Sequence, residues 1–272
     1  MKHYGISSWI ANNLSADEAV EKLAASGFKE IEISGSGSSL LNEWEDDPVG
    51  VCQRLKAIGI HVLSIHCPVA GRSLDHTDRI TRQASIDANI EYFNKMEKCG
   101  IKEIVIHPMG GGDYSTPEKH AKSRACSAGS LGILAEHAGQ TGIRMAVENL
   151  VKNRPGSTTA DLLEMIEGLG DHVGICFDVG HAEQAHLDLV NELKTAISAE
   201  KLFSLHIHDV DAASGKDHFI PGEGRIDWNT FIFLLDDCGF QGGRILEISP
   251  PETGVAERLR KAAVVKNEWS RD

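Results

Sequence analysis

Ionisable side chains stand at the ends of several short apolar segments of this chain. The segment Val173–Asp178 finishes with an aspartate, and comparable segments carry Glu148, His206 and Glu247 close to their ends. These residues recur at intervals of roughly 30 to 40 residues, the length of one strand–helix unit. Burying several carboxylates together without a counter-ion is costly. The pattern therefore predicts that distant segments deliver these side chains to one divalent cation.

A second group of ionisable residues consists of histidines near the ends of further segments or in the loops that follow, namely His66, His107, His181 and His218. Together with the first four residues they would form a nitrogen-rich cluster that holds several Zn²⁺ ions. Taken alone, the first four form an oxygen-rich set suited to Mn²⁺, Mg²⁺ or Co²⁺. We expect one divalent metal ion, with Mn²⁺ preferred and Mg²⁺, Co²⁺ or Zn²⁺ as alternatives.

The segments that carry these residues alternate with amphipathic helical stretches. The predicted strands are His3–Ser8, Glu30–Ser34, His61–His66, Glu103–His107, Arg144–Glu148, Val173–Asp178, Phe203–His208 and Arg244–Ser249. The helical stretches carry ordinary signals, such as Ser15 as N-cap, Glu18 as its capping-box partner and Gly27 as the stop. Repeated helix–glycine–strand units favour parallel strands with right-handed crossovers.

Eight such units predict an α/β fold, a single (β/α)₈ TIM barrel over residues 1–272. The active site of such a barrel lies at the C-terminal ends of its strands, where the ionisable residues stand. A doubly wound sheet is the alternative, but its first turn normally reads G-x-G-x-x-G, and "YGISSW" does not. We interpret the glycine-rich "SGSGSS" and "GGGDYSTP" as βα loops, with phosphate binding as the alternative.

Composition and charge restrict the partners of the chain. With 27 Lys and Arg against 40 Asp and Glu, the net charge is −13, which opposes non-specific binding to nucleic acid. No apolar run reaches the roughly 18–20 residues of a membrane span. The N-terminal "MKHYGISSWI" is typical of a strand rather than a signal peptide. We therefore expect a cytoplasmic protein with a small-molecule substrate and no nucleic-acid or membrane partner.

Seven motifs connect the chain to a known superfamily. In chain order they are "SIHCP", "VIHP", "MAVEN", "CFDVGH", "LHIHD", "DHFIPGEGRIDW" and "ILEIS". In this order they resemble the xylose-isomerase-like TIM barrels, over essentially the whole chain. That superfamily contains sugar isomerases and epimerases, inosose dehydratases and the AP endonuclease IV family. Dimers and tetramers are common among these proteins, so the resemblance also suggests a homo-oligomer.

The resemblance implies roles for individual residues. Glu148, Asp178, His206 and Glu247 match the single-metal site of ketose epimerases, and His181 matches a substrate-binding histidine. His66, His107 and His218 match zinc ligands of the endonuclease family. One departure stands out, because Lys216 falls where that family has an aspartate ligand. An ammonium group there would repel a third zinc ion.

We therefore expect a divalent-metal-dependent sugar isomerase or epimerase. It would abstract the proton next to a carbonyl and stabilise the resulting enediolate with the metal. Glu148 and Glu247 would be the base and acid on the two faces of that carbon. The residues expected to line the substrate pocket are His66, His107, His181, His208, His218 and Trp9. Structural roles are the alternative for Trp9 and His208.

Three other functions are compatible with the same residues. An inosose-type dehydratase would use the same metal and base, a zinc phosphodiesterase acting on abasic DNA would need two or three metals, and a non-catalytic barrel would only bind a ligand. The sequence leaves open whether a sugar substrate carries phosphate. Arg72, Lys216 and Arg225 are candidates for binding it, with surface solvation as the alternative.

Overall fold

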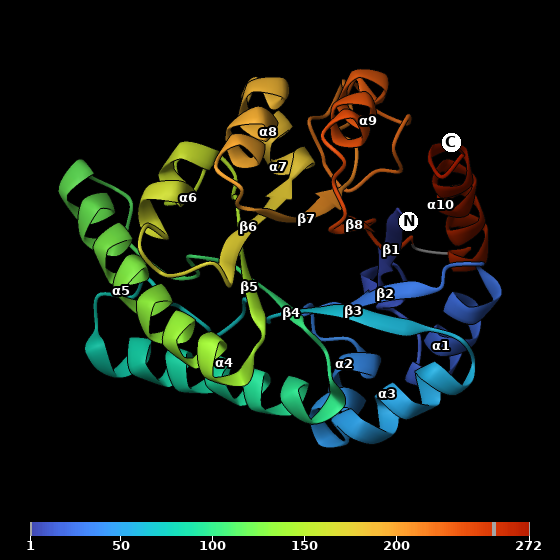
Figure 1. Cartoon of the computed structure of the whole chain (residues 1–272), viewed down its shortest axis with the longest axis horizontal. Helices are drawn as coiled ribbons and strands as arrows, with labels where there is room; N and C mark the ends of the chain where they lie inside the picture. Colours follow the sequence, from blue (N-terminus) through green and yellow to red (C-terminus); the bar gives the residue numbers. More distant parts are fainter. Residues whose placement is uncertain (1, 252–253, 272) are drawn as a thin grey trace.

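Eight parallel strands close into a barrel in the order in which they occur in the chain (Figure 1). The computed structural model describes residues 2–251 and 254–271. The strands are β1 (His3–Ser7), β2 (Glu30–Ile33), β3 (His61–His66), β4 (Glu103–Ile106), β5 (Arg144–Glu148), β6 (Val173–Asp178), β7 (Leu202–Ile207) and β8 (Gly243–Leu246). Pairing of β1 with β8 closes the sheet. The predicted single (β/α)₈ barrel is confirmed.

The predicted strand bounds differ from the observed ones mainly at the C-terminal ends. β3, β5 and β6 have the predicted bounds, whereas the prediction ran one residue too far for β1, β2, β4 and β7 and three too far for β8. The regular strand pairing ends there because the chain turns into the βα loops, although the Glu247 N–H still donates to the carbonyl of Ile207 at 3.1 Å. His107, His208 and Glu247 consequently lie just beyond the paired region, at the mouth of the barrel.

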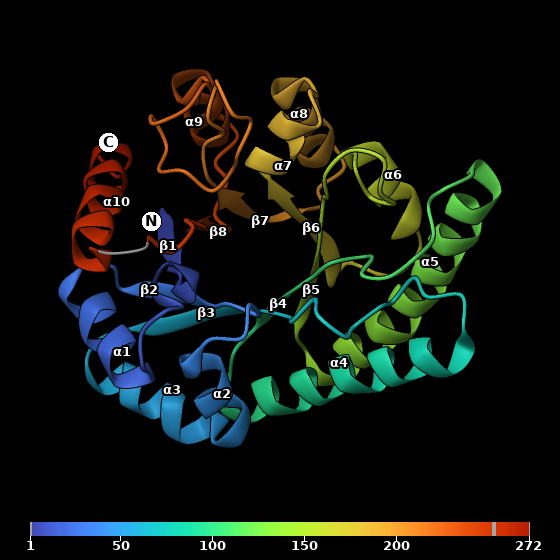
Figure 2. The ribbon, with the colours of Figure 1, turned by 180° about the vertical axis from the view of Figure 1, so that it is seen from behind.

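Helices surround the barrel on the outside, as Figures 1 and 2 show from opposite sides. They are the short 3₁₀ helix Ser8–Ala11 and α1 (Ala16–Ala25), α2 (Ser39–Asp46), α3 (Pro48–Ala57), α4 (Arg79–Cys99), α5 (Pro117–Thr141), α6 (Thr159–Met165), α7 (Val179–Gln184), α8 (Leu189–Ser198), α9 (Trp228–Asp237) and α10 (Val255–Trp269). The expected capping box is present, since Ser15 and Glu18 each accept from the other's backbone N–H. Gly27, just after α1, has the positive φ of 84° expected of a helix stop.

Side chains along each strand point alternately into and out of the barrel, and this alternation decides at which level of the barrel the ionisable side chains lie. Ala146, Cys176, Ser204 and Ile245 are buried inside the barrel, each two residues before one of the four predicted metal ligands. Because alternate residues of a strand share a face, the ligands point to the same interior one level higher. A packed floor of small and apolar side chains therefore supports the ionisable layer.

The beginning of β1 lies close to the end of helix α10 (Figure 2). Lys2 Nζ donates a hydrogen bond of 3.2 Å to the carbonyl of Trp269, at the end of α10. Within the described residues, none of the helices combines the length and apolar character that crossing a bilayer requires.

Candidate metal centre

Four of the predicted ligands meet at the C-terminal mouth of the barrel. Ligand atoms of Glu148, Asp178, His206 and Glu247 all lie within 4.8 Å of one another, and the four residues are buried. Strand register explains this meeting, because Asp178 on β6 is paired with His206 on β7. Glu148 ends β5, and Glu247 follows β8, on the outer sides of the same four-strand run. Their spacing fits a single divalent cation.

The imidazole of His206 has one nitrogen available for such a cation. Its Nε2 atom lies 3.2 Å from Glu32 Oε1 and donates to this carboxylate. Its Nδ1 atom faces carboxylate oxygens, at 3.3 Å from Glu148 Oε1 and 3.4 Å from Glu247 Oε2. Nδ1 and Glu148 Oε1 are buried and without a hydrogen-bond partner in the described part of the chain. A proton on Nδ1 or a cation between these groups would satisfy them, so the point at which they meet is a candidate cation position.

The carboxylates and histidines of this layer shift one another's pKa values. Burial opposes protonation of His206, but Cys176, Glu247 and Glu32 outweigh it and hold its pKa well above 6.5. Burial likewise raises the pKa of Glu247, yet His206 and His218 overcome this effect and keep it below 4.5. The carboxylates are thus ionised and hold positive charge close to them, which suits a metal site.

Glu148 is the hub of the ionisable layer. Its Oε2 atom lies 3.0 Å from His66 Nε2 and 2.9 Å from His107 Nε2. Its Oε1 atom lies 3.4 Å from His181 Nδ1. Burial raises the pKa of Glu148, but the charges of His107 and His206 prevail and place it well below 4.5. Glu148 is therefore a carboxylate that touches both the four-ligand cluster and the neighbouring histidines.

His66 and His107 form a second group with Glu148, whose ligand atoms also lie within 4.8 Å of one another. His66 Nδ1 is 2.9 Å from the carbonyl oxygen of Cys67, so this nitrogen carries the proton and donates it. The lone pair of a neutral His66 would then point from Nε2 at the Glu148 carboxylate. Either a second proton or a cation resolves this opposition, and His66 has a raised pKa of about 9 because Glu148, Glu32 and Glu247 offset its burial.

His181 and Asp178 lie in the same turn of the chain, at the start of helix α7. Asp178 is the N-cap of α7, and its Oδ1 atom accepts from the His181 N–H at 2.6 Å. His181 Nδ1 donates to the carbonyl of Asn149 at 3.1 Å, which leaves Nε2 for a ligand or substrate. The D-x-x-H spacing thus places a carboxylate and an imidazole together through one helix cap.

His208 lies behind Asp178 rather than at the pocket surface. Its Nε2 atom donates to Asp178 at 3.0–3.1 Å, and its Nδ1 atom accepts from the backbone N–H of His218 at 3.0 Å. The side chain is fully buried. Because both nitrogens are occupied, the geometry favours the structural alternative for His208 over contact with a substrate.

His218 and Trp9 form an aromatic wall next to this layer. His218 stacks on His208 with ring centroids 4.0 Å apart, and Trp9 meets His218 edge-on at 4.6 Å. His218 Nε2 lies 3.5 Å from Glu247 Oε2, while Nδ1 pairs with Asp217 at 3.0 Å. The wall therefore borders the predicted metal ligands through His218.

Lys216, two residues before His218, is exposed.

Glu32 is a site residue that the sequence analysis missed. It is fully buried and accepts a hydrogen bond of 2.8 Å from Ser64 Oγ besides its contact with His206. A signal was available, since alternation in Glu30–Ile33 places Glu32 on the same face as Glu30. Glu32 stands two residues before the end of the predicted strand Glu30–Ser34, so a pattern of residues at strand ends does not point to it.

The triglycine loop after β4 already holds an anion of the chain itself. The backbone N–H groups of Gly110, Gly111 and Gly112 donate to the Asp75 carboxylate at 3.0–3.1 Å. Tyr114 donates its hydroxyl to the same group. This overturns the alternative that "GGGDYSTP" binds phosphate, because the amides that would bind it are occupied.

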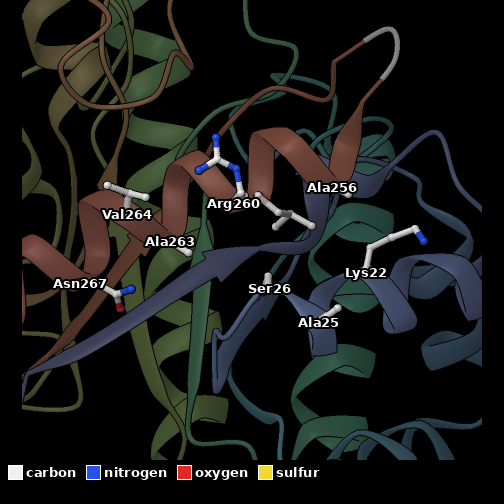
Figure 3. Close-up of a pocket in the computed structure, with 9 residues that line it drawn as sticks. Lys22, Ala25, Ser26, Ala256, Arg260, Ala263, Val264 and Asn267 are labelled. Atoms are coloured by element: carbon white, nitrogen blue, oxygen red, sulfur yellow. The ribbon is translucent and has the colours of Figure 1, made fainter.

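A separate groove of about 310 Å³ lies on the outer surface between α1 and α10 (Figure 3). Lys22 and Ser26 come from one side of it, and Arg260 and Asn267 from the other. The groove contains none of the predicted site residues. The groove is therefore separate from the candidate metal centre.

Comparison with curated proteins gives distant relatives of more than two kinds, which include a 3-dehydroshikimate dehydratase of Pseudomonas putida, 24% identical over 269 residues and covering 92% of this chain and 40% of the relative. A probable endonuclease 4 of Thermoplasma volcanium is 23% identical over 259 residues, covering 89% of this chain and 88% of the relative. An inosose isomerase of Halalkalibacterium halodurans is 26% identical over 185 residues, covering 59% of this chain and 64% of the relative.

Solved structures of similar fold include sugar epimerases. A D-tagatose 3-epimerase-like protein superposes with a TM-score of 0.83 at 20% identity, over 99% of this chain and 97% of the other. D-psicose 3-epimerase with D-tagatose, from Clostridium cellulolyticum H10, gives a TM-score of 0.80 at 19% identity, over 99% of both chains. At these identities the likeness shows the fold alone. The family model described as xylose isomerase-like TIM barrel matches residues 20–264, and the chain belongs to that family.

Proposed function

We propose that this protein is a divalent-metal-dependent isomerase or epimerase of a sugar or sugar derivative. One observation carries the proposal, namely the buried four-ligand cluster in which Glu148 and Glu247 flank His206 Nδ1. A set of three carboxylates and one imidazole suits Mn²⁺, Mg²⁺ or Co²⁺ better than it suits a structural zinc ion. Structural neighbours that are sugar epimerases support the same reaction class.

The metal would be held by Glu148, Asp178, His206 and Glu247. When bound, it supplies a Lewis acid that polarises the substrate carbonyl and makes the adjacent C–H more acidic. The remaining chemistry belongs to side chains. Glu148 and Glu247 come from different sides of the ligand cluster, so one carboxylate serves as base and the other returns a proton on the opposite face of the carbon.

Other residues orient these groups or the substrate. Glu32 and His208 are assigned positioning roles, because each hydrogen-bonds a ligand, His206 and Asp178 respectively. His181 presents Nε2 to a substrate hydroxyl. His66 and His107 hold the second carboxylate oxygen of Glu148 and border the substrate, as does the wall of Trp9 and His218.

A zinc phosphodiesterase is the second candidate. The additional group His66, His107 and Glu148 favours it, as do the relatives described as probable endonuclease 4. The net charge of −13 opposes it, because a DNA-binding surface needs clustered cations. Metal analysis of protein purified without added metal separates the two, since two or more tightly held zinc ions per chain would favour the phosphodiesterase.

The decisive experiment is proton exchange in D₂O. Purified protein with Mn²⁺ is incubated with a panel of ketoses, inososes and keto acids, and deuterium incorporation is followed by NMR. We expect deuterium on the carbon beside the carbonyl of a ketose, together with its epimer or aldose isomer. Loss of water from an inosose would instead assign the dehydratase alternative. Absence of exchange across the whole panel would refute the proposal.

A further inference from the structure

A pocket of about 480 Å³ adjoins the metal centre on the side of β2 and β3. The β2–α2 loop, helix α2 and the β3–α4 loop form this β2–β3 pocket, and its polar lining includes Ser36, Asn42, Glu45, His66 and Arg72. His66 links the two sites, because its Nε2 atom also contacts Glu148. A substrate whose reacting carbon lies at the metal centre thus has room for its remote end here.

Two opposite charges face each other in the β2–β3 pocket. Arg72 Nη2 lies 3.9 Å from Glu45 Oε1, and their side chains are 17% and 33% exposed. The guanidinium lies over the ring of Tyr92, whose hydroxyl donates to the same Glu45 carboxylate. Arg72 Nη1 has no hydrogen-bond partner in the described part of the chain. The pair offers donors and an acceptor side by side but no net positive charge.

Two other groups suited to an anion, the triglycine loop and Arg225, are likewise taken by carboxylates of the chain. Asp75 fills the triglycine loop. Arg225, a second candidate for a phosphate, pairs with Glu183 at 2.6 Å. At the β2–α2 loop, Ser38 Oγ accepts from the Leu41 N–H at 3.0 Å and caps helix α2. A phosphate ester bound in the β2–β3 pocket would therefore meet Arg72 already paired with a carboxylate, and the Glu45 carboxylate itself.

We infer that the β2–β3 pocket binds the remote end of an uncharged, hydroxyl-bearing substrate and that Glu45 discriminates against phosphate esters. This inference rests on the proposed function and narrows its substrate class. A hydroxyl group both donates and accepts, which matches Arg72 and Glu45 together. A phosphate needs donors only, and Glu45 would repel it.

The test compares an unphosphorylated 2-ketohexose with its 6-phosphate ester. Binding to the Mn²⁺-loaded protein is measured by titration calorimetry, and proton exchange is measured on the same samples. We expect the wild type to bind the phosphate ester at least about tenfold more weakly than the free sugar, since like charges in contact disfavour binding. Glu45→Gln should narrow this difference by improving binding of the ester.

Glu43→Gln is the matched control. Glu43 lies on the same helix but pairs with Arg54 at 2.6 Å and does not line the pocket. Arg72→Met should raise KM for the free sugar while leaving kcat nearly unchanged. Preference of the wild type for the ester, equal effects of Glu45→Gln and Glu43→Gln, or no binding of either sugar would overturn the inference. Selective binding of the free sugar without proton exchange would uphold it and refute the proposed function alone.

Discussion

His206 donates from Nε2 to Glu32, at 3.2 Å from Oε1, and so turns Nδ1 toward Glu148 and Glu247. A carboxylate that holds the far nitrogen of a ligating histidine fixes its tautomer and raises its affinity for metal. We predict that Glu32→Gln lowers Mn²⁺ affinity by about 10–100-fold, measured by calorimetry or electron paramagnetic resonance.

Glu30→Gln provides the comparison for that experiment. Glu30 precedes Glu32 on β2 but pairs with His3 at 2.7 Å, near the opposite end of the barrel. Its substitution should leave Mn²⁺ affinity unchanged. Equal affinities for Glu32→Gln and the wild type would show that Glu32 only fills space.

Substitution Glu148→Gln should abolish proton exchange while the barrel stays folded. The amide keeps the shape of the side chain but cannot accept a proton, and general base catalysis contributes about 10²–10⁴-fold. The measurement is deuterium incorporation at saturating Mn²⁺, with circular dichroism to check the fold. A folded, metal-loaded variant that exchanges at the wild-type rate would remove Glu148 from the base role.

Gly180→Ala should disturb the metal centre from behind. A Cβ atom at Gly180 would lie 1.9 Å from His208 Cε1, so His208 would move away from Asp178. We expect a loss of about 1–3 kcal/mol in stability from overpacking, together with weaker Mn²⁺ binding. Gly129→Ala on α5 is the control, since its Cβ would meet nothing within 4 Å and alanine favours a helix. Similar behaviour of the two variants in thermal unfolding would contradict the prediction.

Removal of the Asp75 carboxylate should loosen the loop after β4. In Asp75→Ala the N–H groups of Gly110, Gly111 and Gly112 lose their acceptor, at a cost of about 1–3 kcal/mol. Hydrogen exchange at these three amides should accelerate. Asp87→Ala, which removes an exposed carboxylate of α4, should leave their exchange rates as they are. Unchanged protection in Asp75→Ala would show that the loop is held by other contacts.

Glu103 should make stability depend on pH. Burial raises its pKa above 4.5, although Arg144 and Ser204 partly oppose this. Between pH 4.5, which is the ordinary pKa of this side chain, and the higher pKa of Glu103 in the folded protein, the folded state holds the proton more firmly than the unfolded chain does. Its contribution to stability therefore falls as pH rises through this window. Urea unfolding of wild type and Glu103→Gln from about pH 5 to pH 8 tests the sign, since the wild type should lose stability relative to the variant. A relative gain would contradict it.

Periodicity and spacing were sufficient to predict the barrel and the convergence of the four ligands. Strand alternation fixes which face Glu148, Asp178 and His206 occupy, and closure of the sheet brings their ends together. Relationships between loops were not predictable in this way. The pairing of Asp75 with the triglycine loop and of Glu45 with Arg72 joins segments whose backbone paths follow no simple period. Glu32 shares its strand face with Glu30, but it stands before the end of its strand, where the spacing of strand-end residues gives no signal.

The proposed metal ligands lie on β5, β6 and β7 and just after β8, whereas the β2–β3 pocket belongs to the neighbouring part of the barrel. On the proposed function, reactivity and substrate choice would be encoded in different stretches of the gene. Exchange of residues 35–45 and 68–72 offers a route to new sugar preferences in which the reaction centre is inherited intact.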